Sequence, residues 1–364
     1  MIVKEVTDIL EELAPLAYAE EFDNVGLLIG DKAVEVSGIL VTLDTLENVV
    51  DEAIAKKCNL IVSFHPIIFS GLKKLTGASY VERVVLKAVR NNIAIYSMHT
   101  ALDNVSEGVN AKICEVLGVL EPRILIPKKG TIKKLITYVP EKEAESLRNA
   151  LFEAGAGTIG NYSHCSFNLI GKGSFKPGEK ANPTLGKSGE THYEKEVQIN
   201  VTFEVFRETA VLNALFKNHP YEEVAYEVYD LLNIHQNIGM GMVGRLQKPM
   251  SETDFLGHLK ERMHTKSIRH TALRAKPIQK VAVLGGSGAF AIGSALKAGA
   301  DVLVTSDIKY HQFYQAEGKM LIADIGHYET EQFTKNLLVD YLTKKIPNFA
   351  ISLSESKTNP IKYF

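Results

Sequence analysis

The sequence predicts an α/β fold in which one α/β domain is split into two halves by an inserted α+β module. In residues 1–123, short apolar segments alternate with segments of helical periodicity, a pattern typical of a mostly parallel sheet. The pattern changes to strand, turn and strand near residue 124, and it returns to the first type after residue 240. We therefore expect three parts, residues 1–123, 124–240 and 241–364.

The composition is that of a folded protein with balanced charge. Of the 364 residues, 45% are hydrophobic and 23% are charged, which excludes a disordered chain. Lys and Arg number 41 and Asp and Glu 43, so we do not expect nucleic acid as a partner. The three cysteines, Cys58, Cys114 and Cys165, form no paired motif, and no long apolar run occurs. We expect a cytoplasmic protein without disulfides and without a membrane span.

Strands and helices alternate in the first part. The first helix has apolar residues three and four positions apart, and the strands are aliphatic runs beside glycine and polar residues. The last two of these strands lead into His65 and His99. The expected elements are a helix over residues 3–16, strands over 26–30 and 38–44, a helix over 45–57, a strand over 59–63, a helix over 78–91 and a strand over 93–98.

The middle part reads as a compact α+β module with βαββαβ-like order. Residues 171–190 are rich in Gly, Pro and Lys and predict an exposed loop. Its lysines could bind anions, although a solvated loop is the favoured interpretation. Residues 219–223, His-Pro-Tyr-Glu-Glu, fit either a turn before the last strand or the lining of a small pocket. The expected elements are two strands within residues 124–140, a helix over 141–155, a strand over 197–206, a helix over 209–218 and a strand over 224–229.

The last part repeats the first. Residues 53–65 align in register with residues 295–307, and residues 93–99 align with residues 321–327. The two halves should therefore face each other, with their strand ends meeting in one crevice. The expected elements are a strand over 280–286, a helix over 287–298, strands over 301–305 and 320–325, and a long helix carrying Phe333, Leu337, Leu338 and Leu342.

Titratable side chains follow the carboxyl ends of these strands, where open α/β sheets bind ligands. Imidazole and carboxylate groups together suit zinc, manganese or iron(II). Each group alone has an ordinary explanation, such as a helix start for His327 and Glu331 or a turn for Asp103. Their convergence at one end of one sheet favours a site. The groups are His65, His99, Asp103, Asp307, His311, His327 and Glu331.

A competing motif lies at Gly286-Ser287-Gly288. It follows a strand and opens a helix, and Asp307 comes about one βαβ unit later, as in a dinucleotide-binding fingerprint. The favoured alternative is that small residues let the helix begin close to the strand.

Several ordered motifs together resemble the NIF-three-like family, also called GTP cyclohydrolase I type 2 homologues. The resemblance covers both α/β halves in order. The middle part is similar to the PII/CutA-like domain inserted in many bacterial members, through HPYEEVAYEV at residues 219–228. The motifs of the two halves are FDNVGLLIG at 22–30, FHPIIF at 64–69, HTALDN at 99–104, SDIKYH at 306–311 and GHYETE at 326–331.

The resemblance implies a centre of two adjacent divalent metals. Carried over by position, the metal ligands are His65, Asp103, His327 and Glu331. Phe64 stands where the family motif has a first histidine, so one of the ions lacks a ligand unless a neighbour such as His99 supports it. The usual glycine before Asp307 is Ser306. We expect zinc, manganese or iron, one or two ions per chain, and the resemblance further implies a toroidal homohexamer with inserted domains near the openings of the ring.

Two functions follow as hypotheses. In a metal-dependent hydrolase acting on GTP or a related small molecule, His65 and Asp103 would hold one ion and His327 the other, with Glu331 as the bridge. His99 and His311 are the candidates for proton transfer. In the alternative, the protein binds metal without catalysis and regulates or interacts, with the inserted module sensing a small molecule or a partner. A dinucleotide enzyme using the Gly286 loop is a minor third hypothesis.

Overall fold

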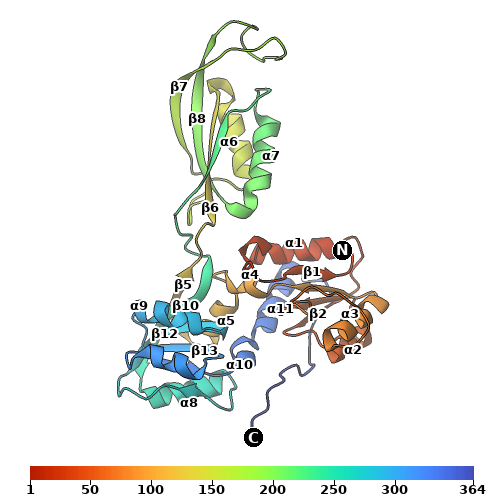
Figure 1. The fold of residues 1–364 in the computed structure, drawn as a ribbon, viewed down its shortest axis with the longest axis vertical. Coiled ribbons are helices and arrows are strands. Elements are labelled where there is room, and N and C mark those ends of the chain that lie inside the picture. The colour runs from red at the N-terminus through yellow and green to blue at the C-terminus, as the bar shows by residue number, and fades with distance from the viewer. The chain divides into compact units, whose positions relative to one another are not determined.

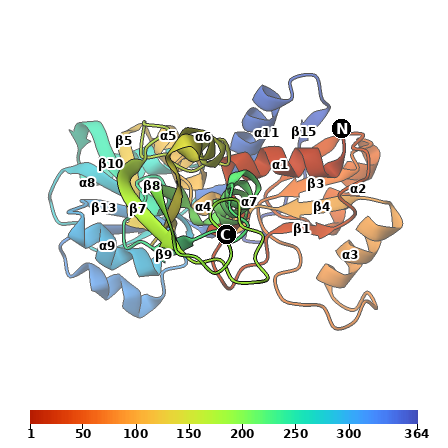
Figure 2. The ribbon, with the colours of Figure 1, turned by 90° about the horizontal axis from the view of Figure 1, so that it is seen from above.

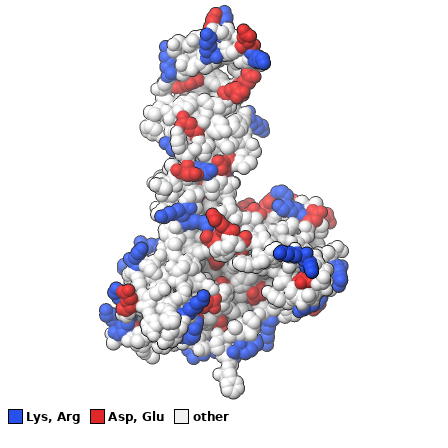
Figure 3. All heavy atoms as spheres, in the orientation of Figure 1, with Lys and Arg blue, Asp and Glu red and all other residues white.

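The computed structural model describes residues 1–364, which form two compact units. The larger unit joins Met1–Pro127 to Asn237–Phe364, and the smaller unit is Lys128–Gln236. Both units contain helices packed on sheets, so the expected mixed α/β fold is confirmed. On the face shown in Figure 3, charges of both signs are interspersed.

The first sheet of the larger unit is built mainly of parallel strands. Its strands are β1 (Gly26–Ile29), β2 (Ile39–Thr42), β3 (Leu60–Ser63), β4 (Ala94–Ser97) and β15 (Ile351–Leu353). They lie in the order β1-β4-β3-β2-β15, and only β1 is antiparallel to its neighbour. Every residue of β2, β3 and β4 is buried, as expected for parallel strands covered on both faces.

Four longer helices accompany this sheet. They are α1 (Val3–Leu13), α2 (Glu47–Ala55), α3 (Tyr80–Arg90) and α11 (Thr334–Lys345). The helix α3 begins where the Ser79 hydroxyl accepts a hydrogen bond of 3.2 Å from the Glu82 amide. The helices α2 and α3 contact each other, and α11 contacts β2 and α1. An aliphatic core joins α2 and α3 to the sheet through Leu40, Val49, Ile61, Val85 and Ile95.

The second sheet of the larger unit also has three parallel strands at its centre. Its strands are β5 (Val119–Pro127), β10 (Gly239–Met250), β11 (Arg269–His270), β12 (Ile278–Ser287), β13 (Val302–Ser306) and β14 (Leu321–Asp324). Their order is β11-β14-β13-β12-β10-β5. The strands β12, β13 and β14 are parallel, and β10 is antiparallel to both of its neighbours.

The remaining helices of the larger unit are short or lie beside the second sheet. They are α4 (His99–Asp103), α5 (Val109–Leu117), α8 (Glu252–Arg262), α9 (Ile292–Lys297), α10 (His327–Glu331), and the 3-10 helices η1 (Leu16–Tyr18), η4 (Ala289–Ala291) and η5 (Tyr310–Ala316). No helix of the chain combines the length and the apolar character that crossing a membrane requires.

Each sheet of the larger unit is completed by a strand from the other half of the chain. The C-terminal strand β15 pairs with β2 of the first sheet, and β5 pairs with β10 of the second. Figure 2 shows α11 and β15, in blue, beside the red and orange elements of the first sheet. The two halves therefore fold as one unit.

The smaller unit has the βαββαβ order that the sequence predicts. Its elements are β6 (Ile132–Pro140), η2 (Glu141–Glu143), α6 (Ala144–Glu153), β7 (Phe167–Phe175), β8 (His192–Glu204), η3 (Val205–Arg207), α7 (Glu208–Asn218) and β9 (Tyr226–Asp230). The antiparallel sheet has the order β7-β8-β6-β9. Both helices cover the same face of the sheet (Figure 1). The core between them includes Leu135, Leu147, Ile199, Val211 and Leu215.

Two expectations about local structure are wrong in part. The expected loop over residues 171–190 begins too early, because β7 continues to Phe175 and pairs with His192. This edge strand carries glycine and lysine at exposed positions, so it lacks the apolar alternation that predicts strands. The expected helix over residues 287–298 begins later, with a 3-10 turn at Ala289–Ala291 before α9.

Candidate metal centre

The first side of the centre is the end of β3. After Ser63 the chain continues parallel to β2, and the His65 amide donates to the Leu43 carbonyl at 2.9 Å. Asp44 follows Leu43 just after the end of β2, and its Oδ1 lies 2.8 Å from Nδ1 of His65. Two neighbouring strands thus supply an imidazole and the carboxylate that orients it. Nε2 is left to face the centre.

The second side repeats this arrangement at the ends of β13 and β14. His327 begins α10, and its Nδ1 lies 2.6 Å from Oδ2 of Asp307, which follows β13. The hydroxyl of Ser287 donates to the same Asp307 oxygen at 2.5 Å. Asp307 has a φ of +57°, so the backbone turns there directly after the strand. The second imidazole is therefore oriented by a carboxylate in the same way as the first.

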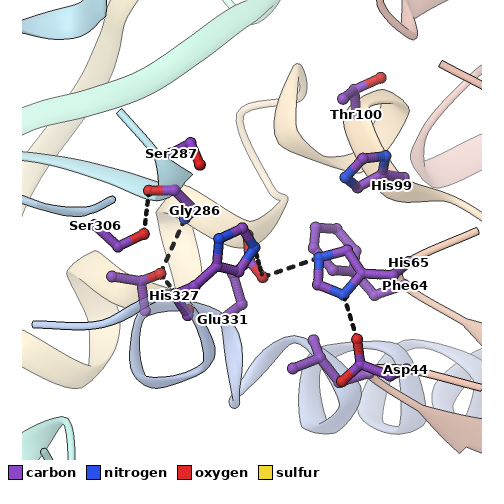
Figure 4. A network of polar contacts seen from close by, with 12 residues as sticks. Asp44, Phe64, His65, His99, Thr100, Gly286, Ser287, Ser306, His327 and Glu331 are labelled. Carbon is purple, nitrogen blue, oxygen red and sulfur yellow. Dashed lines mark hydrogen bonds and ion pairs between the residues drawn. The ribbon is translucent and has the colours of Figure 1, made fainter. Parts of the chain in front are cut away.

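The two imidazoles converge on Glu331. Its Oε2 lies 3.1 Å from Nε2 of His65 and 3.2 Å from Nε2 of His327. Ligand atoms of these three residues all lie within 4.8 Å of one another, and Figure 4 shows the two rings on either side of the carboxylate. The expected meeting of the two halves at one site is therefore present for these three residues.

Gly286 makes room for this carboxylate. Its φ is +69°, and a Cβ atom there would lie 2.5 Å from Oε1 of Glu331. Its amide donates to the Thr330 hydroxyl at 2.9 Å, and its carbonyl accepts from Ser306 at 2.6 Å. The glycine thus permits a close approach of backbone and carboxylate, which accounts for its presence without a dinucleotide.

Asp103 lies close to the centre but outside the group of three. Its Oδ1 is buried without a hydrogen-bond partner. Burial raises the pKa of Asp103 well above its usual value, and the Glu331 carboxylate raises it further, whereas His65 lowers it. The side chain is therefore within electrostatic reach of the other three expected ligands, and its carboxyl favours the protonated form unless a cation is bound nearby.

The pKa values within the group reflect burial opposed by pairing. Burial disfavours charge on His65, but Asp44 and then Glu331 raise its pKa to about 10. Burial likewise disfavours charge on His327, but Glu331 and then Asp307 raise its pKa to about 9. Burial would raise the pKa of Glu331, but the two imidazoles lower it to about 2. A cation that binds both Nε2 atoms must therefore displace protons from them.

The donor set fits a divalent cation. Oε2 of Glu331 is within ion-pair distance of both imidazoles but forms no aligned hydrogen bond with either, and it is buried. Buried polar atoms are normally paired, whereas this oxygen has only its two ion-pair contacts and Oδ1 of Asp103 has no hydrogen-bond partner. Metal-binding histidines usually donate a hydrogen bond from their other ring nitrogen to a carboxylate, and Asp44 and Asp307 lie at that nitrogen, Nδ1, of His65 and His327.

Aromatic and histidine side chains cover the first side of the centre. Phe64 is completely buried, and its ring centroid lies 4.9 Å from that of His65 and 5.5 Å from that of His99. Nδ1 of His99 lies 2.8 Å from Oδ1 of Asp23, which makes a third histidine–aspartate pair. The rings of His99 and His65 are 5.2 Å apart. His99 therefore lies beside the centre, although it is not within the group of three.

Two further observations concern residues around the centre. His311 is exposed in η5 and packs edge-on against Tyr310, so the structure does not bring it to the group of three. A cavity of about 470 Å³ opens beside His65 and His327, and Arg269, Tyr328 and the C-terminal residues Asn359 and Tyr363 also line it.

Sequence reasoning did not identify Asp44 and Asp23 as partners of histidines. Asp44 has a usable signal, because it lies two residues past the end of β2, much as Asp307 lies one residue past the end of β13. Asp23 lies in an irregular segment before β1, and nothing in its spacing predicts contact with His99. Asp307 was expected at the site, but as one more strand-end group rather than as the partner that orients His327.

Comparison with known proteins identifies the family. The chain matches Duf34/NIF3 (NGG1p interacting factor 3) over residues 1–360. A Bacillus subtilis (strain 168) protein named GTP cyclohydrolase 1 type 2 homolog is 38% identical over 370 residues, covering 99% of this chain and 98% of that protein. A solved structure described as a Bacillus cereus protein related to NIF3 is 36% identical, with a TM-score of 0.86 and coverage of 100% of this chain and 99% of that one. The chain belongs to the Duf34/NIF3 family.

Proposed function

We propose that this protein binds divalent metal at His65, Asp103, His327 and Glu331 and uses it to hydrolyse a small molecule. The supporting observation is the convergence of two aspartate-oriented imidazoles on one buried carboxylate oxygen. A structural ion pair would need only one histidine. Two oriented imidazoles, with a second buried carboxyl nearby, are instead the donor set of a zinc, manganese or iron site.

Each residue has a separate role in this proposal. His65 and Asp103 would hold one ion and His327 the other, with Glu331 contributing to both. Asp44 and Asp307 fix the tautomer of the two imidazoles by accepting from Nδ1. When bound, such ions polarise a substrate oxygen and lower the pKa of water.

His99 is the proposed proton-transfer residue. Its Nδ1 is engaged by Asp23, which orients the ring and leaves Nε2 to take up or release a proton. Its ring lies beside His65, whereas His311 is exposed in a different segment. Among the two candidates from the sequence, the geometry therefore favours His99.

The substrate is proposed as GTP or a related nucleotide, from the names of the relatives and from the cavity beside the centre. The cavity of about 470 Å³ falls in the range of small-molecule sites, roughly 300–1,000 Å³. Arg269 on its wall suits a phosphate oxygen, although its guanidinium also pairs with Asp324. Bound cations would offset the negative charge of the acidic lining residues Asp44, Asp307, Asp324 and Glu329.

Metal analysis together with an activity assay tests the proposal. We expect purified protein dialysed against metal-free buffer to retain zinc, manganese or iron, and Glu331→Ala to lose it. Wild type should hydrolyse GTP or p-nitrophenyl phosphate in the presence of one of these metals, and Glu331→Ala should not. His311→Ala is the matched control and should behave as wild type. Equal metal content in wild type and Glu331→Ala, with the fold intact by circular dichroism, would refute the site.

A non-catalytic, metal-binding regulatory function is the second candidate. Phe64 favours it, because a completely buried phenylalanine beside His65 cannot donate to a metal. The family motif has a histidine at this position. Under this candidate, metal is retained but no member of a broad panel of nucleotides and phosphate esters is turned over.

The family resemblance also leads us to propose a homohexamer. The smaller unit would be its PII/CutA-like module, because it has the βαββαβ order. Light scattering on the purified chain tests the assembly, and a mass of one or two chains would refute it.

A further inference from the structure

The smaller unit contains a cavity of its own, separate in sequence from every residue of the metal centre. It measures about 370 Å³, and its walls are mainly apolar and aromatic. The segment between β7 and β8, at the far end of the hairpin in Figure 1, forms one wall, and the turn before β9 forms another. Lining residues include Tyr138, Phe175, Pro177, Leu185, Glu196 and Tyr221.

The segment between β7 and β8 is fastened to the opposite wall. The Asn182 amide donates to Oε2 of Glu222 at 2.8 Å, and the Thr184 hydroxyl donates to the Pro220 carbonyl at 2.7 Å. These bonds join two segments that are far apart in the sequence, so the cavity is pre-formed. Pre-formed apolar cavities with a few fixed polar groups are the usual form of small-molecule sites.

Glu196 is the polar group that points to a ligand. Its Oε1 accepts a hydrogen bond of 2.8 Å from the Tyr221 hydroxyl. Burial and the carboxylate raise the pKa of Tyr221, so the hydroxyl stays a donor. Oε2 accepts no hydrogen bond from the chain and lies over Gly173, where a Cβ atom would come within 1.9 Å of it. Gly173 therefore makes space for a carboxylate that has one oxygen oriented and the other unpaired.

The charge and shape of the walls define the chemical class of the ligand. Three lining side chains are acidic, Glu196, Glu222 and Glu223, against one basic, Lys176. The rings of Phe175 and Tyr221 lie 5.7 Å apart and offer apolar surfaces to a flat molecule. An anion would be repelled, whereas a cationic or multiply donating edge would pair with Oε2.

We infer that this cavity is a binding site for a planar small molecule with a cationic or hydrogen-bond-donating edge, which Glu196 receives. The inference does not depend on the metal centre, because none of the cavity residues belongs to it. The sequence left two interpretations of residues 219–223, a turn before the last strand or the lining of a pocket. Both apply, since Tyr221, Glu222 and Glu223 line the cavity and lie in the bend before β9.

Benzamidine is a suitable probe, because it combines a flat ring with a cationic edge that matches a carboxylate. On the full-length chain we expect titration calorimetry to give a dissociation constant on the order of 1 mM, as for other small fragments. Benzoate, with the same ring and the opposite charge, should not bind. Hydrogen exchange of peptides covering residues 176–191 should slow when benzamidine is added.

Variants assign the binding to this cavity rather than to other acidic surfaces. Glu196→Gln removes the charge, and Gly173→Ala displaces the carboxylate, so each should weaken benzamidine binding by about tenfold. Glu194→Gln is the matched control, because Glu194 is on the same strand, pairs with His192 and does not line the cavity. Equal binding to wild type and to both cavity variants, or no binding to wild type, would overturn the inference. Unchanged melting temperatures would show that all variants fold.

Discussion

The two strand ends that meet at Glu331 use the same histidine–aspartate pair in different surroundings. On the first side, Phe64 is completely buried and packs against His65. On the second side, His327 lies beside Gly286, whose backbone is hydrogen-bonded to the Thr330 and Ser306 hydroxyls. The side chain of His65 is 21% exposed and that of His327 is 40% exposed.

This difference in exposure should make the same histidine–aspartate interaction stronger on one side than on the other. Electrostatic interactions strengthen where water and its high dielectric constant are excluded. The His65–Asp44 pair, which lies beside the buried Phe64, should therefore hold its imidazole more firmly than the more exposed His327–Asp307 pair. Pairing raises the pKa of both imidazoles, to about 10 for His65 and to about 9 for His327, so both pairs favour the charged ring.

The largest effect is expected from removing the orienting carboxylates. Asp44→Asn and Asp307→Asn should each weaken metal binding by about 10–100-fold. The loss should be greater for Asp44→Asn, because the side chain of Asp44 is 29% exposed and that of Asp307 is 48% exposed. Competition with a chromophoric chelator measures both affinities. Asp8→Asn, on the exposed side of α1, is the control, and the reverse order of losses would contradict the comparison.

The next effect is the pH dependence of metal affinity. Metal must displace protons from His65 and His327, whose pKa values of about 10 and about 9 lie above neutrality. Apparent affinity should therefore rise with pH, by up to about tenfold per displaced proton for each pH unit. His327→Ala should reduce the slope by removing one of the protons. An affinity that is flat between about pH 6 and about pH 8 would show that no such protons are displaced.

A smaller effect is expected from restoring a donor at Phe64. Phe64→His places an imidazole beside His65, so the variant should carry more metal per chain than wild type, by at most about one ion. Elemental analysis measures this content. Phe216→His is the matched control, since Phe216 is 48% exposed and lies in α7 of the smaller unit. Equal metal content in wild type and Phe64→His would mean that the missing donor does not limit occupancy.

The smallest effect on metal binding, none at all, is expected at Glu52. This residue anchors the segment after β15 and should change the stability of the fold instead. Its carboxylate accepts from the Ser354 hydroxyl at 2.7 Å and the Glu355 amide at 2.9 Å. Burial would raise its pKa, but Lys56 and these donors lower it from 4.5 to about 2. Because the folded-state pKa is depressed, the stabilisation is present above pH 4.5 and is lost as pH falls toward 2.

We therefore expect wild type to lose on the order of 2 kcal/mol of unfolding free energy over this acid range from Glu52 alone. Glu52→Gln should lack that contribution at neutral pH and show a shallower acid loss. Denaturant titration at several pH values measures it. A change in metal content in Glu52→Gln would contradict the separation between this anchor and the centre.

The sequence predicted the parts of the fold that carry strong local signals. The buried strands β2, β3, β4, β13 and β14 are aliphatic runs, and each lies within or next to its expected range. The strands β10 and β15 were not expected, because their pairing with residues distant in sequence decides their conformation. Local patterns carry little information about such pairing.

The site was predictable to a similar extent. His65 follows the end of β3, His327 begins α10 and Glu331 lies one turn further on that helix, so the ends of the parallel strands bring them together. The role of Gly286 could not be predicted, because the close approach of Glu331 depends on how α10 packs against β12. The roles of Asp103, His99 and His311 in chemistry stay predictions.

The exchange of strands between the halves has a consequence for the order of folding. Ile39 of β2 pairs with Leu60 of β3 on one side and with Ile351 of β15 on the other, so the second edge of β2 stays open until β15 has been translated. Open edges invite pairing with other chains, and such long-range closure is slow. Nascent protein should thus expose this edge until β15 emerges, and the proposed set of metal ligands is complete only once Glu331 has been translated.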